Sequence, residues 1–400
     1  MNLQLHRKAE MDSARTRMRR VALFRSDLLP ISETFIADQF LAYSTWTPSL
    51  IGFRFVPGID LSRTGADVIQ KKKTMISELH RKVIQHGQYF GLKSSRLRSM
   101  IAKTGASIVH AHFGYDAILV YDVTMDLNLP MIVTLHGTDV LTKREQWLSG
   151  KNGRYFKRYP DKLQKMFGDP RVWFITVSNA LKRSALALGA PADRTITLYT
   201  GVDCNTFLPA RKSGPKKHVL FVGRLVEFKG CEYLIKAMKN VQRRHSDIGL
   251  RIIGDGPLRK DLEHLATDLG VRADFMGAAP RSTVVSELAG ALTLCVPSVT
   301  DSLGNFEAFG MVILEAQASA VPVVTSALGG SEAVVHGKTG FVFQERDVAA
   351  IEEHISALAS DTHRAEEMGR AAREYVCRQF SITTCIKAVE SLYDKVCLTG

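Results

Sequence analysis

The stretch ALTLCVPSVTDSLGNFEAFGMVILE (residues 291–315) decides the fold, because it runs from a buried strand through a polar loop into a helix. Its first six residues form a short apolar run, which is typical of a buried parallel strand. Its last nine, EAFGMVILE (307–315), place a glutamate at each end of seven uncharged residues. Burying an unpaired carboxylate is costly, so both glutamates need a polar partner. A polar ligand at the tip of a helix that begins near Met311 would supply one.

Short apolar runs of this kind recur along the chain and alternate with longer helical patterns, six in each half. Continuous apolar strands between helices are typical of parallel sheets covered on both faces. We therefore predict an α/β protein with two Rossmann-like, doubly wound parallel-sheet domains that face each other across a cleft. The runs are residues 21–24, 50–55, 107–110, 131–135, 172–177, 195–199, 218–223, 249–254, 272–277, 291–296, 321–325 and 340–343.

The join between the halves is expected at GVDCNTFLPARKSGPKK (201–217), where Gly, Pro, Ser and paired basic residues interrupt both patterns. The first residues are basic and aperiodic, and Met11 or Met18 are alternative natural starts, which leaves open whether residues 1–17 belong to the native protein. The predicted parts are a flexible tail at 1–20, an N-terminal Rossmann-like domain at 21–205 and a C-terminal Rossmann-like domain at 206–380. A final helix at 381–400 either stays with the second domain or returns to the first.

The composition is that of an ordinary globular protein, with 45% hydrophobic residues and 13 Pro in 400 residues. No apolar run is long enough for a transmembrane helix, and the first twenty residues are too polar for a secretory signal. The six Cys show no CxxC spacing, which indicates reduced thiols rather than a disulfide framework or a zinc site. We therefore expect a cytoplasmic protein.

The net charge of +13 comes from the first half of the chain. Residues 1–210 hold 30 Lys and Arg against 17 Asp and Glu, whereas residues 211–400 hold 23 of each. Such an excess of positive charge is suited to binding nucleic acid, an anionic membrane surface or an acidic small molecule. The plain alternative is a solvated surface that binds nothing. The chain has no aromatic-rich RNA motif, zinc ligand set or helix-turn-helix signal, so no nucleic acid is expected. We favour peripheral binding to the inner face of the cytoplasmic membrane.

Two cations follow a predicted strand in GRLVEFKG (223–230), which places Arg224 and Lys229 at a strand end. Ligands of open parallel sheets bind at that edge. A planar guanidinium and a compact ammonium in one short loop suit a diphosphate, although two surface cations are the plain alternative.

The second predicted strand end carries Glu307 in its loop and Glu315 in the first turns of the following helix. Sugar and ribose hydroxyls are good donors to such carboxylates. The helix N-terminus attracts anions, so the N–H groups of Gly310, Met311 and Val312 are candidates to hold phosphate oxygens. The two loops together predict a nucleotide-sugar site.

In order and spacing these motifs resemble the retaining GT-B glycosyltransferases of family 4, over essentially all of the second half. The matching segments are GRLVEFKG (223–230), GDGP (254–257) and EAFGMVILE (307–315), followed by a Gly-rich turn before Glu332. The resemblance implies that Arg224 and Lys229 grip the donor diphosphate, that Glu315 binds the ribose and that Glu307 contacts the transferred sugar. The turn SALGGSEAVV (326–335) is one residue shorter than in many relatives, which leaves the role of Glu332 open.

The first half resembles the family more loosely, through SIVHAHFG (107–114) and MIVTLHGTD (131–139). His136 matches the family histidine near the transferred sugar, whereas His112 is either a site residue or a hydrogen-bonded histidine behind its strand. The segment LLPISETFI (28–36) resembles bacterial exopolysaccharide transferases of the colanic-acid type. It implies that Glu33 and Thr34 help to hold acceptor or donor, unless Ser32 or Thr34 only caps the helix.

The implied reaction moves a sugar from a nucleoside diphosphate to a hydroxyl of a glycan or lipid-linked acceptor, with retention of configuration, in bacterial exopolysaccharide biosynthesis. The expected catalytic residues are His136 and Glu307. Cations and helix N–H groups stabilise the departing diphosphate, so neither a metal nor another cofactor is expected. The alternatives are a sugar-nucleotide epimerase on the same architecture and a basic protein that binds nucleic acid or membranes. A glycosidase with two acidic residues would leave Arg224 and Lys229 unexplained.

Overall fold

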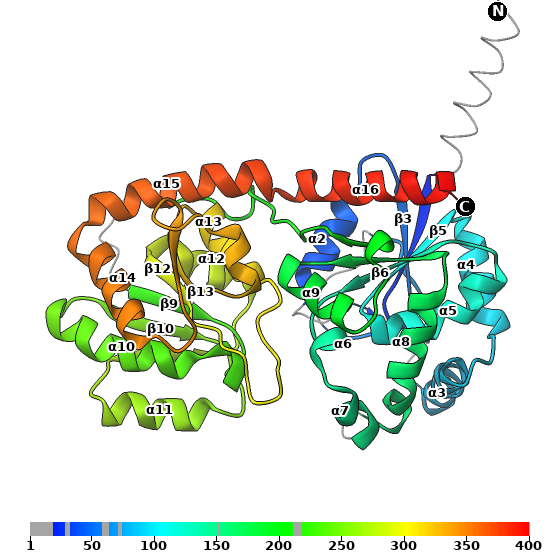
Figure 1. Ribbon diagram of the computed structural model, residues 1–400, viewed down its shortest axis with the longest axis horizontal. Helices are drawn as coiled ribbons and strands as arrows, with labels where there is room; N and C mark the ends of the chain where they lie inside the picture. The colour runs from blue at the N-terminus through cyan, green and yellow to red at the C-terminus, as the bar shows by residue number, and fades with distance from the viewer. Residues whose placement is uncertain are drawn as a thin grey trace, which may run out of the picture. The chain divides into compact units, whose positions relative to one another are not determined.

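The computed structural model describes residues 19–28, 33–57, 64–70, 74–150, 153–210 and 218–399, which form two compact units (Figure 1). Unit 1 contains the described residues up to Val177, together with Leu181–Leu198 and the chain from Ile386 onward. Unit 2 contains Ser178–Ala180 and Tyr199–Cys385. Each unit has its own parallel sheet, which confirms the predicted pair of doubly wound α/β domains. The predicted tail at 1–20 lies outside the described residues, apart from Arg19 and Arg20.

The sheet of unit 2 has the strand order β11-β10-β9-β12-β13-β14 in the described chain, with all neighbours parallel. The order reverses between β9 and β12, where Leu220 of β9 pairs with Leu294 of β12. Ligands of such sheets bind beyond the carboxyl ends of the strands at this reversal. The strands are β9 (His218–Val222), β10 (Gly249–Ile253), β11 (Ala273–Gly277), β12 (Ala291–Val296), β13 (Val323–Ser326) and β14 (Gly340–Phe343).

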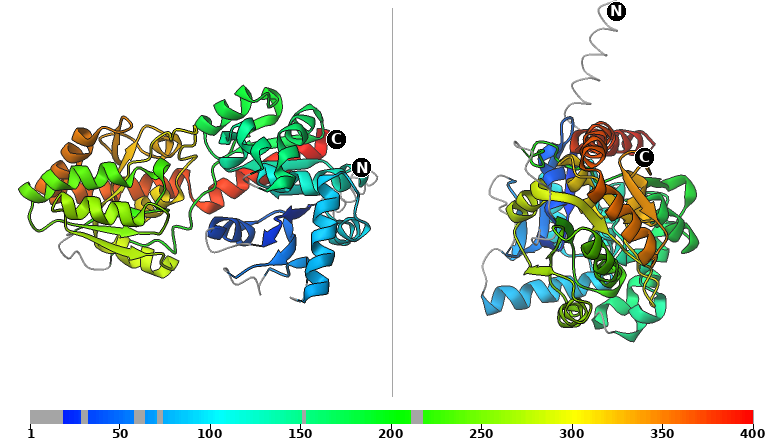
Figure 2. Two further views of the ribbon diagram at one scale, coloured as in Figure 1. Left: turned by 90° about the horizontal axis from the view of Figure 1, so that it is seen from below. Right: turned by 90° about the vertical axis from the view of Figure 1, so that its left-hand side faces the viewer.

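Helices cover both faces of this sheet (Figures 1 and 2). In α10, Leu234, Met238 and Val241 recur at helical spacing and are completely buried, so the apolar stripe turns this helix onto the sheet. The helices of unit 2 are α10 (Cys231–Arg244), α11 (Arg259–Asp268), α12 (Arg281–Gly290), α13 (Met311–Ala318), α14 (Val348–Ser360) and α15 (Thr362–Gln379), with short 3₁₀ turns η4 (Glu227–Lys229) and η5 (Gly329–Ala333).

The sheet of unit 1 has the order β2-β3-β1-β5-β6-β7-β8, with β4 pairing to β3, and is also parallel throughout its described strands. Its order reverses between β1 and β5, where Leu23 pairs with His110. The very short β2 and β4 were not predicted, because neither has a long apolar run. The strands are β1 (Arg20–Phe24), β2 (Asp27–Leu28), β3 (Thr47–Phe55), β4 (Asp67–Gln70), β5 (Ile108–His112), β6 (Met131–Leu135), β7 (Val172–Thr176) and β8 (Thr195–Thr197).

Unit 1 also has helices on both faces of its sheet (Figure 1). They are α2 (Thr34–Ala42), α3 (Met75–Tyr89), α4 (Ser95–Thr104), α5 (Gly114–Asp126), α6 (Thr138–Leu141), α7 (Arg144–Ser149), α8 (Tyr159–Gly168) and all but the first two residues of α9 (Asn179–Ala187), with 3₁₀ turns η2 (Arg154–Arg158) and η3 (Ala192–Arg194). The last helix of the chain, α16 (Ile382–Thr399), starts in unit 2 and adds Ile386, Val389 and Tyr393 to the core of unit 1.

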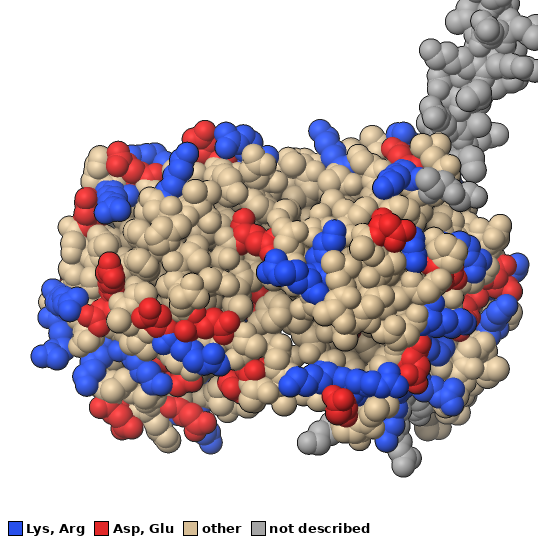
Figure 3. All heavy atoms as spheres, viewed as in Figure 1, with Lys and Arg blue, Asp and Glu red and all other residues tan. Residues whose placement is uncertain are grey.

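Charged side chains of both signs are interspersed over the face shown in Figure 3. In unit 1, Asp126 pairs with both Lys93 and Arg98 at 2.7 and 3.0 Å, and Asp161 pairs with Arg144 at 2.7 Å. Exposed pairs of this kind contribute little stability, but they offset part of the basic charge locally. No helix of the described chain has the length and apolar character needed to cross a bilayer.

Glu390 on α16 fastens the C-terminal helix to the turn before β3. Its carboxylate accepts hydrogen bonds from the backbone N–H groups of Ser44, Thr45 and Trp46 at 2.7–2.9 Å and from the Ser44 hydroxyl at 2.8 Å. Burial raises the pKa of Glu390, but these hydrogen bonds outweigh burial and hold the pKa below its usual 4.5. The ionised form is therefore the one that stabilises unit 1.

We expect Glu390→Gln to lower the free energy of unfolding of unit 1 by about 2 kcal/mol at neutral pH, because an amide accepts fewer hydrogen bonds and brings donors of its own. The pKa of Glu390 is lower in the folded state than in the unfolded state, so the ionised carboxylate stabilises the protein at pH values above the unfolded-state pKa. This stabilisation is lost as the pH falls through the folded-state pKa. Denaturant unfolding of wild type and variant should therefore converge below about pH 4. A stability difference that stays constant down to pH 3 would contradict the assignment.

Candidate functional site

The loop after β9 in unit 2 is tied to the turn after β10 by backbone hydrogen bonds. Gly223 N–H donates to Ile253 C=O and Leu225 N–H to Asp255 C=O, both at 2.9 Å. The GRLVEFKG loop and the GDGP turn therefore form one rigid rim at the carboxyl edge of the sheet.

Gly230 closes this loop and begins α10. Its φ of 63° lies in the left-handed region, and a Cβ built there would be 1.9 Å from the backbone oxygen of Pro297. That proline directly follows β12. Only glycine therefore lets the loop after β9 touch the loop after β12.

The two loops are also joined by an ion pair between the Lys229 ammonium and the Glu307 carboxylate. The two side chains are 17% and 12% exposed. Lys229 comes from the loop after β9 and Glu307 from the loop after β12, so the pair lies at the reversal of strand order. Burying both charges of such a pair costs a large desolvation free energy, and the attraction between the charges offsets only part of it. Arg224, five residues before Lys229, is exposed and makes no ion pair with any described residue.

The N-terminus of α13 lies beside Glu307. The helix is capped by Gly310, which has a φ of 78° and no side chain to satisfy the first N–H groups. A Cβ built on Gly310 would be 3.3 Å from Cγ of Glu307, so the glutamate side chain packs against the start of the helix. Met311 and Val312 form its first turn, and Glu315 is its fifth residue and is partly buried. The structure therefore brings Lys229, Glu307 and this helix tip together.

Glu332, whose role was left open, has its carboxylate occupied within unit 2. It accepts hydrogen bonds from the backbone N–H groups of Asn179 and Ala180 at 3.0 Å each and from the Tyr199 hydroxyl at 3.1 Å. The neighbouring Gly329 lies so close to Ala308 that a Cβ would be 2.1 Å from its backbone oxygen. The Gly-rich turn therefore packs directly against the backbone of the loop that carries Glu307.

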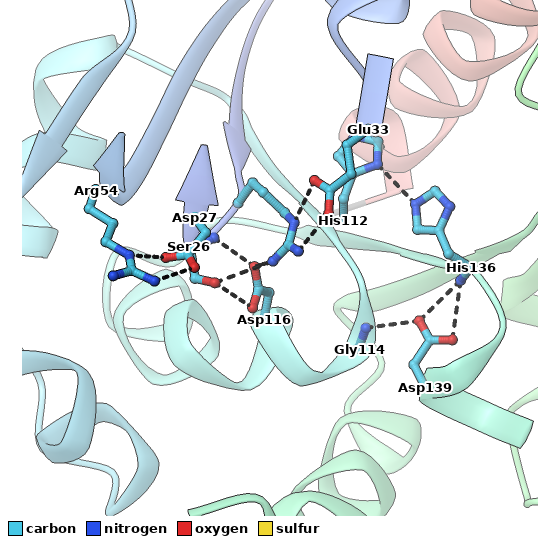
Figure 4. A network of polar contacts seen from close by, with 10 residues as sticks. Ser26, Asp27, Glu33, Arg54, His112, Gly114, Asp116, His136 and Asp139 are labelled. Carbon is cyan, nitrogen blue, oxygen red and sulfur yellow. Dashed lines mark hydrogen bonds and ion pairs between the residues drawn. The ribbon is translucent and has the colours of Figure 1, made fainter. Parts of the chain in front are cut away.

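Unit 1 has a second polar cluster at its own reversal of strand order, built around Arg25 after β1. The Arg25 guanidinium forms a bidentate ion pair with Glu33, at N–O distances of 2.7 and 2.9 Å, and a second ion pair with Asp116. Asp116 accepts from the hydroxyl and backbone N–H of Ser26 at 2.8 and 2.6 Å (Figure 4). Burial lowers the pKa of Arg25, but Asp116 and Glu33 raise it above its ordinary value. Glu33 is 6% exposed, so its carboxylate holds Arg25 rather than facing solvent.

Neutral histidines extend this cluster along the ends of β5 and β6. His112 Nδ1 lies 3.1 Å from His136 Nε2 (Figure 4). Burial and the charge of Arg25 lower the pKa of His112 to about 3. Burial, His112 and Arg25 lower the pKa of His136 well below 6.5. Both rings are therefore uncharged at neutral pH and are suited to hydrogen bonding.

Asp139, on the first turn of α6, shapes the backbone around His136. It is buried, and its carboxylate accepts from the N–H groups of Gly114, His136 and Gly137 at 2.9–3.2 Å. The loops after β5 and β6 are thereby locked together. His136 itself is only partly buried, and the Phe113 ring lies against it with centroids 4.4 Å apart.

Of the site residues predicted for unit 1, the structure brings Glu33, His112 and His136 into one region. Thr34 opens α2, which Glu33 precedes without a side-chain capping bond, and Ser32 lies outside the described residues. Sequence reasoning missed Arg25 and Asp116. The one sequence signal for these two residues was their position, one residue after the predicted strand 21–24 for Arg25 and six residues after the predicted strand 107–110 for Asp116. In the described part of the chain, no group of three or more His, Cys, Asp or Glu side chains is placed to hold a metal ion.

Comparison with known proteins gives matches over most of the chain. Residues 207–375 match the family described as "Glycosyl transferases group 1", and residues 73–206 match "Glycosyltransferase Family 4". A glycogen synthase of Mycobacterium tuberculosis is 30% identical over 293 residues, covering 72% of this chain and 68% of the relative. A GDP-mannose-dependent alpha-(1-6)-phosphatidylinositol monomannoside mannosyltransferase of Mycolicibacterium smegmatis is 37% identical over 227 residues, 53% of this chain and 59% of that enzyme.

Solved structures show the same fold at low sequence identity. Sucrose-phosphate synthase from Thermosynechococcus elongatus superposes with a TM-score of 0.74 at 18% identity, covering 96% of this chain and all of the other. Anabaena Alr3699/HepE, solved with UDP and glucose, gives 0.70 at 19% identity and covers 94% of this chain and 100% of its own. The two parallel-sheet units define the GT-B fold. The chain belongs to the group 1 glycosyltransferases.

A side chain at Gly230 would meet two penalties, a clash with the loop after β12 and the strain of a positive φ. Comparison with a second glycine of nearly equal φ separates the effect of the clash from that of the strain. Gly270 has a φ of 65°, and a Cβ there would have nothing within 4 Å. Gly270→Ala should cost about 1 kcal/mol of stability through strain alone. Gly230→Ala should cost more and should weaken binding of a nucleoside diphosphate at least about tenfold, because the loop after β9 must move away from Pro297.

Thermal unfolding and calorimetric titration of both variants measure these two quantities. Equal stability and equal nucleotide affinity in Gly230→Ala and Gly270→Ala would mean that contact between the loops is irrelevant to the site.

Proposed function

We propose that the protein is a retaining glycosyltransferase that transfers a hexose from a nucleoside-diphosphate sugar to a hydroxyl of a glycan or lipid-linked acceptor. The observation that carries this proposal is the convergence of Lys229, Glu307 and the tip of α13 at the reversal of strand order in unit 2. Cationic and N–H donors at that edge suit a diphosphate, and the carboxylates beside them suit sugar hydroxyls.

In this proposal the diphosphate lies between Lys229, Arg224 and the N–H groups of Gly310, Met311 and Val312. As the bond to the anomeric carbon breaks, negative charge grows on the departing diphosphate. Donors fixed in advance lower that barrier, and the loss of one typically costs about 3 kcal/mol. This chain's own groups supply the charge, so we propose a reaction without a metal.

The ion pair has a defined part in donor binding. Before binding, Glu307 neutralises Lys229, which avoids an unpaired, largely buried ammonium. A diphosphate supplies Lys229 with a stronger anionic partner and frees Glu307 to accept hydrogen bonds from the transferred sugar. Glu315, on the helix that follows, is proposed to bind the ribose hydroxyls.

His136 is the proposed group from unit 1 that contacts the transferred sugar. Its pKa lies well below 6.5, so the neutral ring can donate or accept a hydrogen bond without adding charge beside a positively charged sugar. The Arg25–Glu33–Asp116 cluster and Asp139 act as positioning groups, because they hold the loops after β1, β5 and β6. Glu33, which acts through its pair with Arg25, and Thr34, at the start of α2, are proposed to help hold acceptor or donor.

Two relatives support the donor and acceptor classes. The mannosyltransferase of Mycolicibacterium smegmatis is named for GDP-mannose and phosphatidylinositol monomannoside, and the Anabaena structure was solved with UDP and glucose. We propose a role in bacterial exopolysaccharide biosynthesis, in the cytoplasm at the inner face of the membrane. A sugar-nucleotide epimerase would use the same donor site, and product analysis separates the two: a glycoside product indicates transfer, whereas an isomerised nucleotide sugar indicates epimerisation.

Lys229→Ala and Glu307→Ala should each lower turnover at least about a hundredfold, through loss of diphosphate or sugar contacts. Each single variant also leaves a charge unpaired and should be less stable. The double variant should regain stability, because removing both partners leaves no unpaired charge. It should remain as inactive as the single variants, because both contacts to the substrate are still missing.

Lys236→Ala is the matched control, since Lys236 forms an exposed ion pair with Glu232 on α10 and should keep full turnover. Turnover and thermal unfolding are measured on wild type and on all four variants, with UDP, GDP and ADP sugars as donors. Recovery of activity in the double variant would show that the pair is structural only. The nucleotide that raises the melting temperature most identifies the donor base.

A further inference from the structure

Helix α3 (Met75–Tyr89) of unit 1 exposes apolar side chains to solvent and buries polar ones. The residues it buries include Arg81 and Gln88, whereas four apolar side chains point to solvent. We call these four the outer face of α3: Met75, Ile76, Leu79 and Val83, which are 87%, 78%, 63% and 60% exposed. A water-facing helix normally shows the opposite arrangement, with its apolar stripe against the core.

The inward face explains why α3 holds this orientation. The Arg81 guanidinium donates to the side-chain oxygens of Gln70 at 3.0 Å and Gln85 at 2.7 Å. Thr74 and Ser77 form a capping box that fixes the start of the helix. The polar side is therefore tied to β4 and to the helix itself, so the apolar side cannot rotate inward.

The outer face continues past the end of the helix. Phe90 is 56% and Leu92 67% exposed, and the Arg158 guanidinium lies 4.5 Å above the Phe90 ring. Exposed apolar side chains gathered on one face of a helix, with long basic side chains beside them, are typical of an interaction site. In Figure 1 α3 lies at the margin of its unit and is seen end-on.

The surrounding charge identifies the partner. Among the described residues 74–98, four exposed cations stand against one acid, Glu78; the cations are Lys82, Lys93, Arg96 and Arg98. Glu78 pairs with Lys82 at 3.0 Å, and Asp126 from α5 pairs with Lys93 and Arg98, which leaves a clear basic excess. A second copy packed face to face would set these cations against one another. A surface of anionic lipid would accept both the apolar stripe and the cations.

We propose that α3 is a membrane-docking helix, whose outer face enters the headgroup boundary of an anionic bilayer while the flanking Lys and Arg contact lipid phosphates. It deepens the proposed function, because it names the surface that would bring the enzyme to a lipid-linked acceptor. Docking itself needs neither donor nor turnover, so it can be tested separately.

The test is flotation of the full chain with vesicles of phosphatidylcholine alone or mixed with phosphatidylglycerol. Wild type should float with the anionic vesicles, less so at high salt because the ionic part is screened. The double variant Leu79→Glu/Val83→Glu should bind about tenfold more weakly or worse, because it removes apolar area and adds negative charge. Both positions are exposed, so the fold should not change.

The matched control is Leu188→Glu, the same exchange at a 42% exposed position after α9 in the same unit. It should float like wild type. Equal flotation of the double variant and wild type, or no flotation of wild type with anionic vesicles, would overturn the proposal. So would a wild-type dimer that only the double variant dissociates, since α3 would then join two copies.

The nucleotide-induced rise in melting temperature serves as an independent readout. If the double variant loses vesicle binding but keeps this rise, the docking helix is supported without reference to catalysis. If wild type shows no nucleotide response yet floats through α3, the proposed donor site fails while the docking surface stands.

Discussion

The ion pair of Lys229 with Glu307 is the interaction on which the proposed chemistry depends. The two residues are 78 positions apart in the sequence, and they meet because β9 and β12 are neighbours at the reversal of strand order. Gly230 and Gly329 allow the backbones around the pair to touch, as no larger residue would. The sheet topology thus brings a cation, a carboxylate and a helix tip to one edge, and in the proposed function an incoming diphosphate replaces the carboxylate there.

Unit 1 follows the same architectural rule with different chemistry. Its reversal of strand order joins β1 to β5, and there Arg25 pairs with Glu33 and Asp116. Here the cation is locked between two carboxylates and is 8% exposed, so it stabilises loops rather than offering a charge to a ligand. The neutral His112 and His136 lie next to this cluster. In the proposed function, unit 2 therefore receives an anion, and unit 1 presents uncharged polar groups.

Sequence reasoning predicted the fold well where apolar runs were long, and MIVTL (131–135) coincides with β6. It missed β2 and β4, whose pairing depends on the neighbouring β3 rather than on their own residues. It also placed Glu307 and Lys229 at strand ends without foreseeing their direct contact, since residues 78 apart carry no local sign of pairing. Glu33 was predicted to face a ligand, yet the structure pairs it with Arg25, which no motif had singled out. Parallel topology can be predicted from periodicity, whereas pairing of buried charges needs the three-dimensional arrangement.

The most direct test is a crystal structure of the protein with the nucleoside diphosphate that stabilises it most. The account predicts that Lys229 Nζ lies within hydrogen-bond distance of a diphosphate oxygen, that the first N–H groups of α13 face the same group, and that Glu307 has left Lys229. A diphosphate bound elsewhere, with the contact between Lys229 and Glu307 intact, would contradict it.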